Sequence, residues 1–202
     1  MKIALLLKSV GNLEEARFDP DRKTMVRDGP MFPNPFDARA LGAALALRGV
    51  GGSVTVLSMG PPGADGVLAE TLRAGADRAI RIGDPSLAGS DVLLTARVLA
   101  GALRELDADL VLAGRASTDS ETGVVGPEVA ALLDRPMVGP ARSIRGPFAD
   151  SSLEVEVDEE HGRARYRLFP PVLLTVGEKI GKPAKPRSEA GVDSRPELWD
   201  LA

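Results

Sequence analysis

The stretch KIALLLK at residues 2–8 places five consecutive apolar residues between two lysines. An apolar run of this length without polar interruptions is typical of a strand that helices cover on both faces of a parallel sheet. We therefore expect Lys2 to Lys8 to form the first, central strand of the fold.

Helical and strand patterns alternate along the chain after this run. Asn34 and Pro35 predict a helix start, since asparagine accepts a backbone N–H at an N-cap and proline supplies the φ of the first turn. Glycines at 49–52 end that helix. Further strands are expected at 53–58, 78–82 and 109–113, and further helices at 64–74, 90–106 and 125–133. This alternation predicts an α/β fold with a three-layer, mostly parallel, doubly wound sheet, whose ligands bind beyond the carboxyl ends of the strands.

The periodicity changes after Pro136. Apolar residues at 153–157 alternate with acidic ones, and a turn at 159–162 leads into a returning strand at 163–168. Period-two alternation is typical of a strand with one buried face. An antiparallel hairpin is therefore expected at an edge of the sheet, near the C-terminus.

The remaining segments define the domain organisation. The apolar run at 172–176 is expected to rejoin the main sheet, and the polar segment 11–33 to be a long loop of the kind that often serves a site. Residues 1–178 are predicted to form a single α/β nucleotide-binding domain. Residues 179–202, rich in proline and charge, are predicted to be an extended tail that contacts a partner.

Composition narrows the class of protein. The chain has 202 residues, 44% of them apolar, which suits one domain with an ordinary core. It has no cysteine, and its single histidine, His161, falls in the predicted hairpin turn, so we expect no catalytic residues and no metal site. A net charge of −4 without a long basic run argues against a nucleic-acid partner. No apolar run approaches the ~20 residues of a membrane span, so we expect a cytoplasmic protein without membrane insertion.

The stretch GRASTDSETGVVGPE at 114–128 is the strongest candidate for a site. It leaves a predicted strand and enters a predicted helix, whose first backbone N–H groups can bind a phosphate. Gly123 and Gly126 permit close approach of a ligand, and Ser120 or Thr122 can cap the helix or donate a hydroxyl. The same residues also suit an ordinary loop and helix cap.

Several segments, in the same order along the chain, resemble the beta subunit of electron-transfer flavoproteins, including the nitrogen-fixation-associated members. The matching segments are the opening strand that ends in Lys8, ARFDP at 16–20, NPFD at 34–37, SMGPP at 58–62, RAGADRAI at 73–80, the pattern GR-x3-D-x2-TG-x2-GPE at 114–128, and PPVLLTV at 170–176.

The resemblance implies an adenine-nucleotide-hydrolase-like fold and a heterodimer in which an alpha subunit carries most of the FAD site, while this chain binds a structural AMP. FAD would take electrons from dehydrogenases and pass them to a quinone reductase or another acceptor, so this subunit would be no enzyme by itself. The AMP contacts carried over from the family are Leu6, Asn34, Pro35, Phe36, Asp37, Met59, Gly114, Arg115, Ala116, Ser117, Thr118, Asp119, Ser120, Glu121, Thr122, Gly123, Val124 and Val125. Asn34 also suits a plain N-cap, and Phe36 a plain core residue.

The sequence departs from the family at two places. Where members commonly carry Asn, Gln or Thr beside the phosphate, this chain has Gly123, Val124 and Val125, so backbone donors alone remain. The family's C-terminal region normally includes a docking loop for dehydrogenases and an arm around the alpha subunit. Here residues 182–187 run almost directly to the end, as in a short C-terminal variant.

Two other functions stay open. One is a stand-alone adenine-nucleotide-binding sensor that has lost electron transfer. The other is an adenine-nucleotide hydrolase or ATP pyrophosphatase, which the first strand disfavours because no glycine- and serine-rich phosphate loop follows it. The ligand stays open among AMP, ATP and a second FAD.

Overall fold

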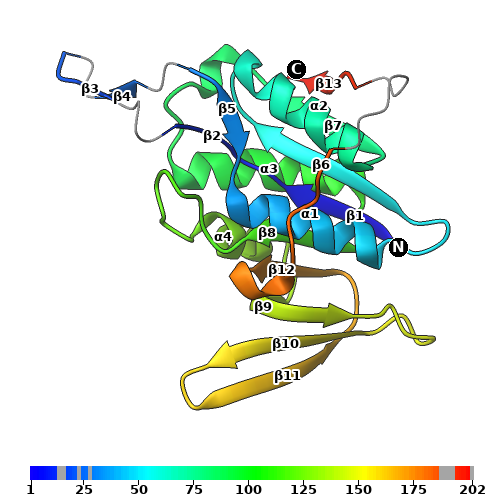
Figure 1. Ribbon diagram of the computed structural model, residues 1–202. Coiled ribbons are helices and arrows are strands. Elements are labelled where there is room, and N and C mark those ends of the chain that lie inside the picture. The colour runs from blue at the N-terminus through cyan, green and yellow to red at the C-terminus, as the bar shows by residue number, and fades with distance from the viewer. Residues whose placement is uncertain (13–16, 22–23, 27–28, 187–193, 201–202) are drawn as a thin grey trace.

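The computed structural model describes residues 1–12, 17–21, 24–26, 29–186 and 194–200. Its centre is a nine-stranded sheet in the order β11-β10-β9-β12-β8-β1-β6-β7-β13 (Figure 1). These strands are β1 (Lys2–Leu6), β6 (Ser53–Met59), β7 (Arg78–Ile82), β8 (Leu110–Gly114), β9 (Met137–Arg145), β10 (Leu153–Glu159), β11 (Gly162–Leu168), β12 (Val172–Val176) and β13 (Glu197–Trp199). The first strand lies between β6 and β8 and pairs in parallel with both, so its predicted central position is confirmed.

The parallel part of the sheet consists of β9, β12, β8, β1, β6, β7 and β13, in that order. Only β10 and β11 are antiparallel to their neighbours. The predicted mostly parallel, doubly wound α/β sheet with an antiparallel hairpin is thus confirmed. The run at 172–176 rejoins the sheet as β12, between β8 and β9.

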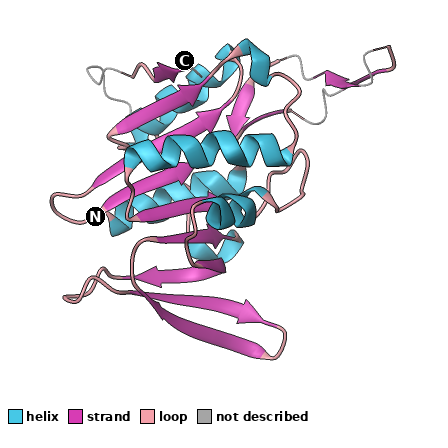
Figure 2. Cartoon of the chain, turned by 180° about the vertical axis from the view of Figure 1, so that it is seen from behind, coloured by secondary structure: helices cyan, strands magenta, loops and turns pink. Residues whose placement is uncertain are grey.

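Helices cover both faces of the sheet. They are α1 (Pro35–Leu47), α2 (Asp65–Ala74), α3 (Val92–Leu106) and α4 (Val125–Leu132), with short 3-10 turns η1 (Pro62–Ala64), η2 (Pro85–Leu87) and η3 (Glu178–Ile180). Ile3 and Leu5 of β1 pack with residues of α1 and α2, whereas Ala4 and Leu6 pack with α3 and α4, because successive side chains of a strand face opposite sides. Figure 1 shows α1 in front of the strands. Figure 2, which views the molecule from the opposite side, shows the long helix α3 in front of them. No helix in the described part of the chain is long and apolar enough to cross a membrane.

Six strands of the described residues were not predicted: β9, β13 and two pairs of three-residue strands. β9 follows Pro136, and β13 lies in the predicted extended tail. The two pairs lie in or next to the segment 11–33, expected to be a loop, and are β2 (Ser9–Gly11) with β5 (Met31–Pro33), and β3 (Arg17–Asp19) with β4 (Thr24–Val26). Strands this short contain too few residues to show a period, and Gly139 and Pro140 interrupt the pattern of β9.

The hairpin of β10 and β11 presents charge on its outer face. Glu156 lies opposite Arg165 and Asp158 opposite Arg163, with closest N–O distances of 3.5 Å and 3.8 Å. Exposed pairs of this kind contribute at most about 1 kcal/mol each. The opposite face carries Val155, which is fully buried in the core. The predicted one-sided burial is therefore correct for β10, whereas the outer strand β11 contains no buried residue.

The described part of the C-terminal segment follows the chain's own surface. The backbone N–H of Ala184 donates to the carbonyl of Ala38 in α1 at 3.1 Å. Further on, β13 adds to the free side of β7, and Arg78 donates two hydrogen bonds to Glu197, at 2.8 Å and 2.7 Å. The division at residue 178 and the contact of the tail with a partner stay predictions.

Candidate functional site

A cavity of about 830 Å³ lies beyond the carboxyl ends of β1, β6, β7 and β8. Its walls include most of the segment 113–126 and the first residues of α3 and α4. The chain continues from β1 to β6 and β7 on one side, while β8 and β12 lie on the other, so β1 and β8 flank the topological switch point. The volume falls within the range of about 300–1,000 Å³ that is usual for small-molecule sites.

Most of the residues proposed from the sequence meet at this cavity. Those that line it are Leu6, Asn34, Asp37, Met59, Gly114, Arg115, Ala116, Ser117, Ser120, Thr122, Gly123, Val124 and Val125. Those proposed from the sequence that do not line it are Pro35, Phe36, Thr118, Asp119 and Glu121. Four parts of the chain, around residues 6, 34–37, 59 and 114–125, thus converge on one space.

Asp37 ties together the two strands at the switch point. Its carboxylate, 5% exposed, accepts the backbone N–H of Lys8 just after β1 and that of Gly114 at the end of β8, each at 2.8 Å. Burial raises the pKa of the Asp37 carboxyl from 3.8 to about 6, although hydrogen bonds from Lys8, Asn34 and Gly114 partly oppose this rise. The floor of the cavity is therefore held by a buried acid.

The side chain of Asn34 holds the loop after β8 and makes no cap bond to α1. Its side chain, in a residue 1% exposed, donates to the carbonyl of Ala116 at 2.9 Å and accepts the backbone N–H of Thr118 at 3.3 Å. Asn34 occupies the N-cap position of α1, as predicted, but its side chain makes no cap bond to the helix. The helix start predicted from the sequence is correct, but the side-chain amide binds the backbone of Ala116, which lies 82 positions further along the chain.

Phe36 and Arg115 form a contact at the rim. The Arg115 guanidinium lies 4.6 Å from the centre of the half-buried Phe36 ring and pairs with Glu178 at 3.0 Å. Because Phe36 is partly exposed and supports a cation, the interpretation of a plain core residue is wrong.

The loop at 114–124 enters α4 without a side-chain cap. Val124 occupies the N-cap position, so Ser120 and Thr122 do not cap the helix. The first N–H groups of an α-helix lack partners within the helix and favour an anion. Since residues 123–126 line the cavity, this helix start faces the ligand space.

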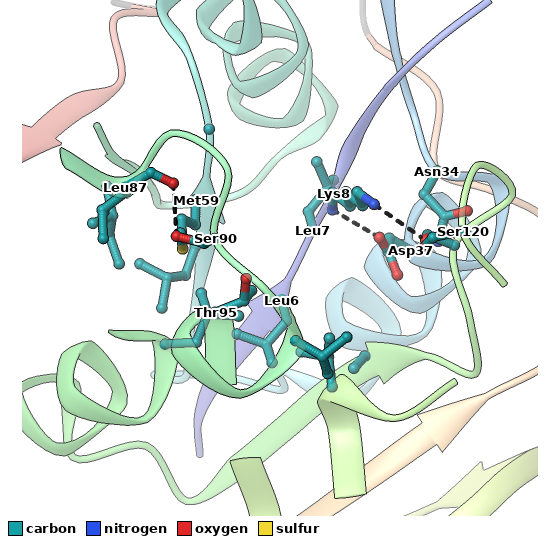
Figure 3. Close-up of a pocket in the computed structure, with 18 of the residues that line it drawn as sticks. Leu6, Leu7, Lys8, Asn34, Asp37, Met59, Leu87, Ser90, Thr95 and Ser120 are labelled. Atoms are coloured by element: carbon teal, nitrogen blue, oxygen red, sulfur yellow. Dashed lines mark hydrogen bonds between the residues drawn. The ribbon is translucent and has the colours of Figure 1, made fainter. Parts of the chain in front are cut away.

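Lys8 was missed as a cavity residue. Its ammonium lies 2.7 Å from an oxygen of Asp119 and 3.4 Å from the hydroxyl of Ser117, which lies 2.8 Å from that of Ser120. Figure 3 shows Lys8, Asn34, Asp37 and Ser120 together at one end of the pocket. A lysine directly after the central strand was the available sequence signal.

The opposite end of the cavity is mainly apolar. Met59, Ile82 and Leu87 contribute side chains there, and the segment 83–92, which the sequence did not suggest, forms the wall. Figure 3 shows Met59, Leu87 and Ser90 on this side. The Ser90 hydroxyl donates to the carbonyl of Leu87 at 2.6 Å. The cavity therefore suits a ligand with an apolar ring at one end and an anion at the other.

A doubly wound α/β sheet with a cavity at its switch point defines a class of small-molecule-binding proteins. Within that class, the electron transfer flavoprotein domain model matches residues 23–196. The chain belongs to the electron transfer flavoprotein family.

Comparison with individual relatives shows which subunit of the family the chain resembles. The chain is 39% identical over 188 residues to electron transfer flavoprotein subunit beta of Thermoanaerobacterium thermosaccharolyticum, with 92% of this chain and 72% of the relative covered. It is 36% identical to the caffeyl-CoA reductase-Etf complex subunit CarD of Acetobacterium woodii, with 91% and 71% covered. It is 38% identical to protein FixA of Azorhizobium caulinodans, with 88% and 66% covered. The resemblance seen in the sequence is thus confirmed, and a beta-type role in electron transfer is supported.

Proposed function

We propose that this chain is the beta-type subunit of a heterodimeric electron-transfer flavoprotein, which binds a structural AMP and helps an alpha subunit to hold FAD. The FAD accepts electrons from dehydrogenases and donates them to a quinone reductase or another acceptor. The chain itself supplies binding and orientation, without catalytic residues of its own, and acts in the cytoplasm.

The convergence of the family-implied residues on one cavity carries this proposal. The end formed by Met59, Ile82 and Leu87 matches an adenine ring in polarity, and the start of α4 with Lys8 matches a phosphate. Gly123, Val124 and Val125 offer no side-chain donor, but their position on the cavity wall leaves backbone donors for the phosphate. The residues present therefore fit a nucleotide.

The identity of the ligand is tested by release. The chain is purified alone and denatured, and the liberated small molecule is identified by mass spectrometry. Stoichiometric AMP is expected. ATP would favour a stand-alone sensor, FAD would mean that this subunit carries a flavin of its own, and an empty protein would indicate that loss of side-chain donors has weakened the site or that the partner completes it.

The subunit role is tested by co-expression with candidate alpha subunits encoded beside this chain. We expect a stoichiometric complex that contains FAD. A chain that binds nucleotide but associates with no flavoprotein would overturn the electron-transfer role and favour the sensor.

A further inference from the structure

We propose that Lys8 binds the phosphate of the cavity's ligand and makes the site prefer a nucleotide to its nucleoside. This inference rests on the proposed function, because it takes the ligand to be a nucleoside phosphate.

The position of the ammonium supports this role. Lys8 follows β1 directly, and its side chain is 43% exposed where it lines the cavity. An ammonium has three donors. Among the contacts of the described residues, Asp119 and Ser117 accept two of them, so the third is available to a ligand. The Ser117 and Ser120 hydroxyls, which also line the cavity, continue the polar surface toward α4.

The distribution of charge gives the cavity a direction. Lys8 and Arg115 are the basic residues among the described residues that line it, and Arg115 is paired with Glu178. Asp84 and Asp91 line the opposite, mainly apolar end, where a phosphate would meet like charge. The Lys8 end also contains two carboxylates, but Asp37 accepts two backbone N–H groups and Asp119 accepts the Lys8 ammonium. An anionic group is therefore favoured where Lys8 and the start of α4 face the cavity.

Asp119 fixes the ammonium in place. Its side chain is 1% exposed and lies 2.7 Å from the lysine nitrogen. The loop that carries it is itself held, because the Thr118 backbone N–H bonds to Asn34. A lysine positioned before the ligand arrives loses less rotamer entropy on binding.

The test compares AMP and adenosine as ligands of the full chain, freed of any co-purified nucleotide, by isothermal titration calorimetry. We expect Lys8→Gln to weaken AMP binding by roughly 10- to 100-fold, as for loss of a charged hydrogen bond. Adenosine binding should change less than about twofold, because adenosine lacks the phosphate that Lys8 contacts. Lys8→Arg should recover most of the AMP affinity.

Lys2→Gln is the matched control. Lys2 lies at the other end of β1 and also pairs with an aspartate, Asp107, at 3.2 Å. Lys2→Gln should leave the affinities for AMP and for adenosine unchanged.

Two results for Lys8→Gln would overturn the inference: unchanged AMP binding, or equal weakening of AMP and adenosine, which would indicate a purely structural lysine. A wild-type chain that binds AMP no better than adenosine would also overturn it while leaving an adenine site in place. A wild-type chain that binds neither ligand would refute the proposed AMP site itself.

Discussion

Replacement of Asp37 by asparagine tests whether the buried acid costs the protein stability. The carboxylate lies almost wholly out of water between the ends of β1 and β8 and accepts two backbone N–H groups. Asparagine has the same shape, but its NH₂ group cannot accept a backbone N–H as the second carboxylate oxygen does, which costs about 1–3 kcal/mol at every pH. Because asparagine does not ionise, Asp37→Asn removes the pH dependence of stability that this position gives the wild type.

The magnitude follows from the pKa of Asp37. Burial raises it from 3.8 to about 6, and each unit is worth about 1.4 kcal/mol, so ionisation in the folded state costs about 3 kcal/mol more than in the unfolded state. The folded chain binds the proton more tightly, so this stability is present below pH 3.8 and is lost as pH rises through 6. We expect the free energy of unfolding of Asp37→Asn, relative to that of the wild type, to rise by up to about 3 kcal/mol between pH 4 and pH 7.

Urea unfolding from pH 4 to 7.5, followed by the fluorescence of Trp199, gives the free energy of unfolding of both proteins. Their difference cancels the titration of all other carboxyl groups. Asp107→Asn, on the surface at the end of α3, controls for the loss of one negative charge. A difference in stability between the two proteins that stays the same from pH 4 to pH 7.5 would refute the reasoning, since burial would then not raise the pKa of Asp37.

Other substitutions test the geometry around the cavity. A methyl group on Gly114 would lie 2.7 Å from Cβ of Phe36, so we expect Gly114→Ala to lower the free energy of unfolding by about 1–3 kcal/mol. Gly101→Ala in α3, where nothing lies within 4 Å, should instead raise it by about 0.5–1 kcal/mol; equal effects in urea unfolding would contradict the close packing. Asn34→Ala removes both bonds to the loop and should cost about 1–3 kcal/mol and weaken AMP binding in calorimetry, whereas unchanged affinity would show that the loop needs no support.

The parts of the fold visible in the sequence are those set by local pattern. The run at residues 2–8 identified the central strand because its five inner residues are all apolar, and the glycines at 49–52 marked the end of α1, whose last residue is Leu47. At 153–157 the alternation of apolar and acidic residues identified the first strand of the hairpin. Such signals need only a few adjacent residues.

The site was only partly predictable because its key contacts join distant segments. Lys8 and Asp119 are separated by 111 positions, and Asp37 and Gly114 by 77. No pattern of neighbouring residues encodes these pairs, and the resemblance to the family supplied most of the cavity residues instead. Asn34 illustrates the limit, because the residue was identified while its partners were not.

The small strand β13 has a consequence for the behaviour of the molecule in a crowded solution. The last parallel strand of a sheet exposes a row of unpaired N–H and C=O groups, which is a template for joining another chain. Here three residues of the chain's own tail occupy that row on β7, and at the far side of the sheet the outer strand β11 carries Arg163, Arg165 and Arg167. One border ends in a strand of only three residues, which offers little backbone for pairing, and the other border carries charged side chains, so the addition of a second chain is disfavoured at both edges of the sheet.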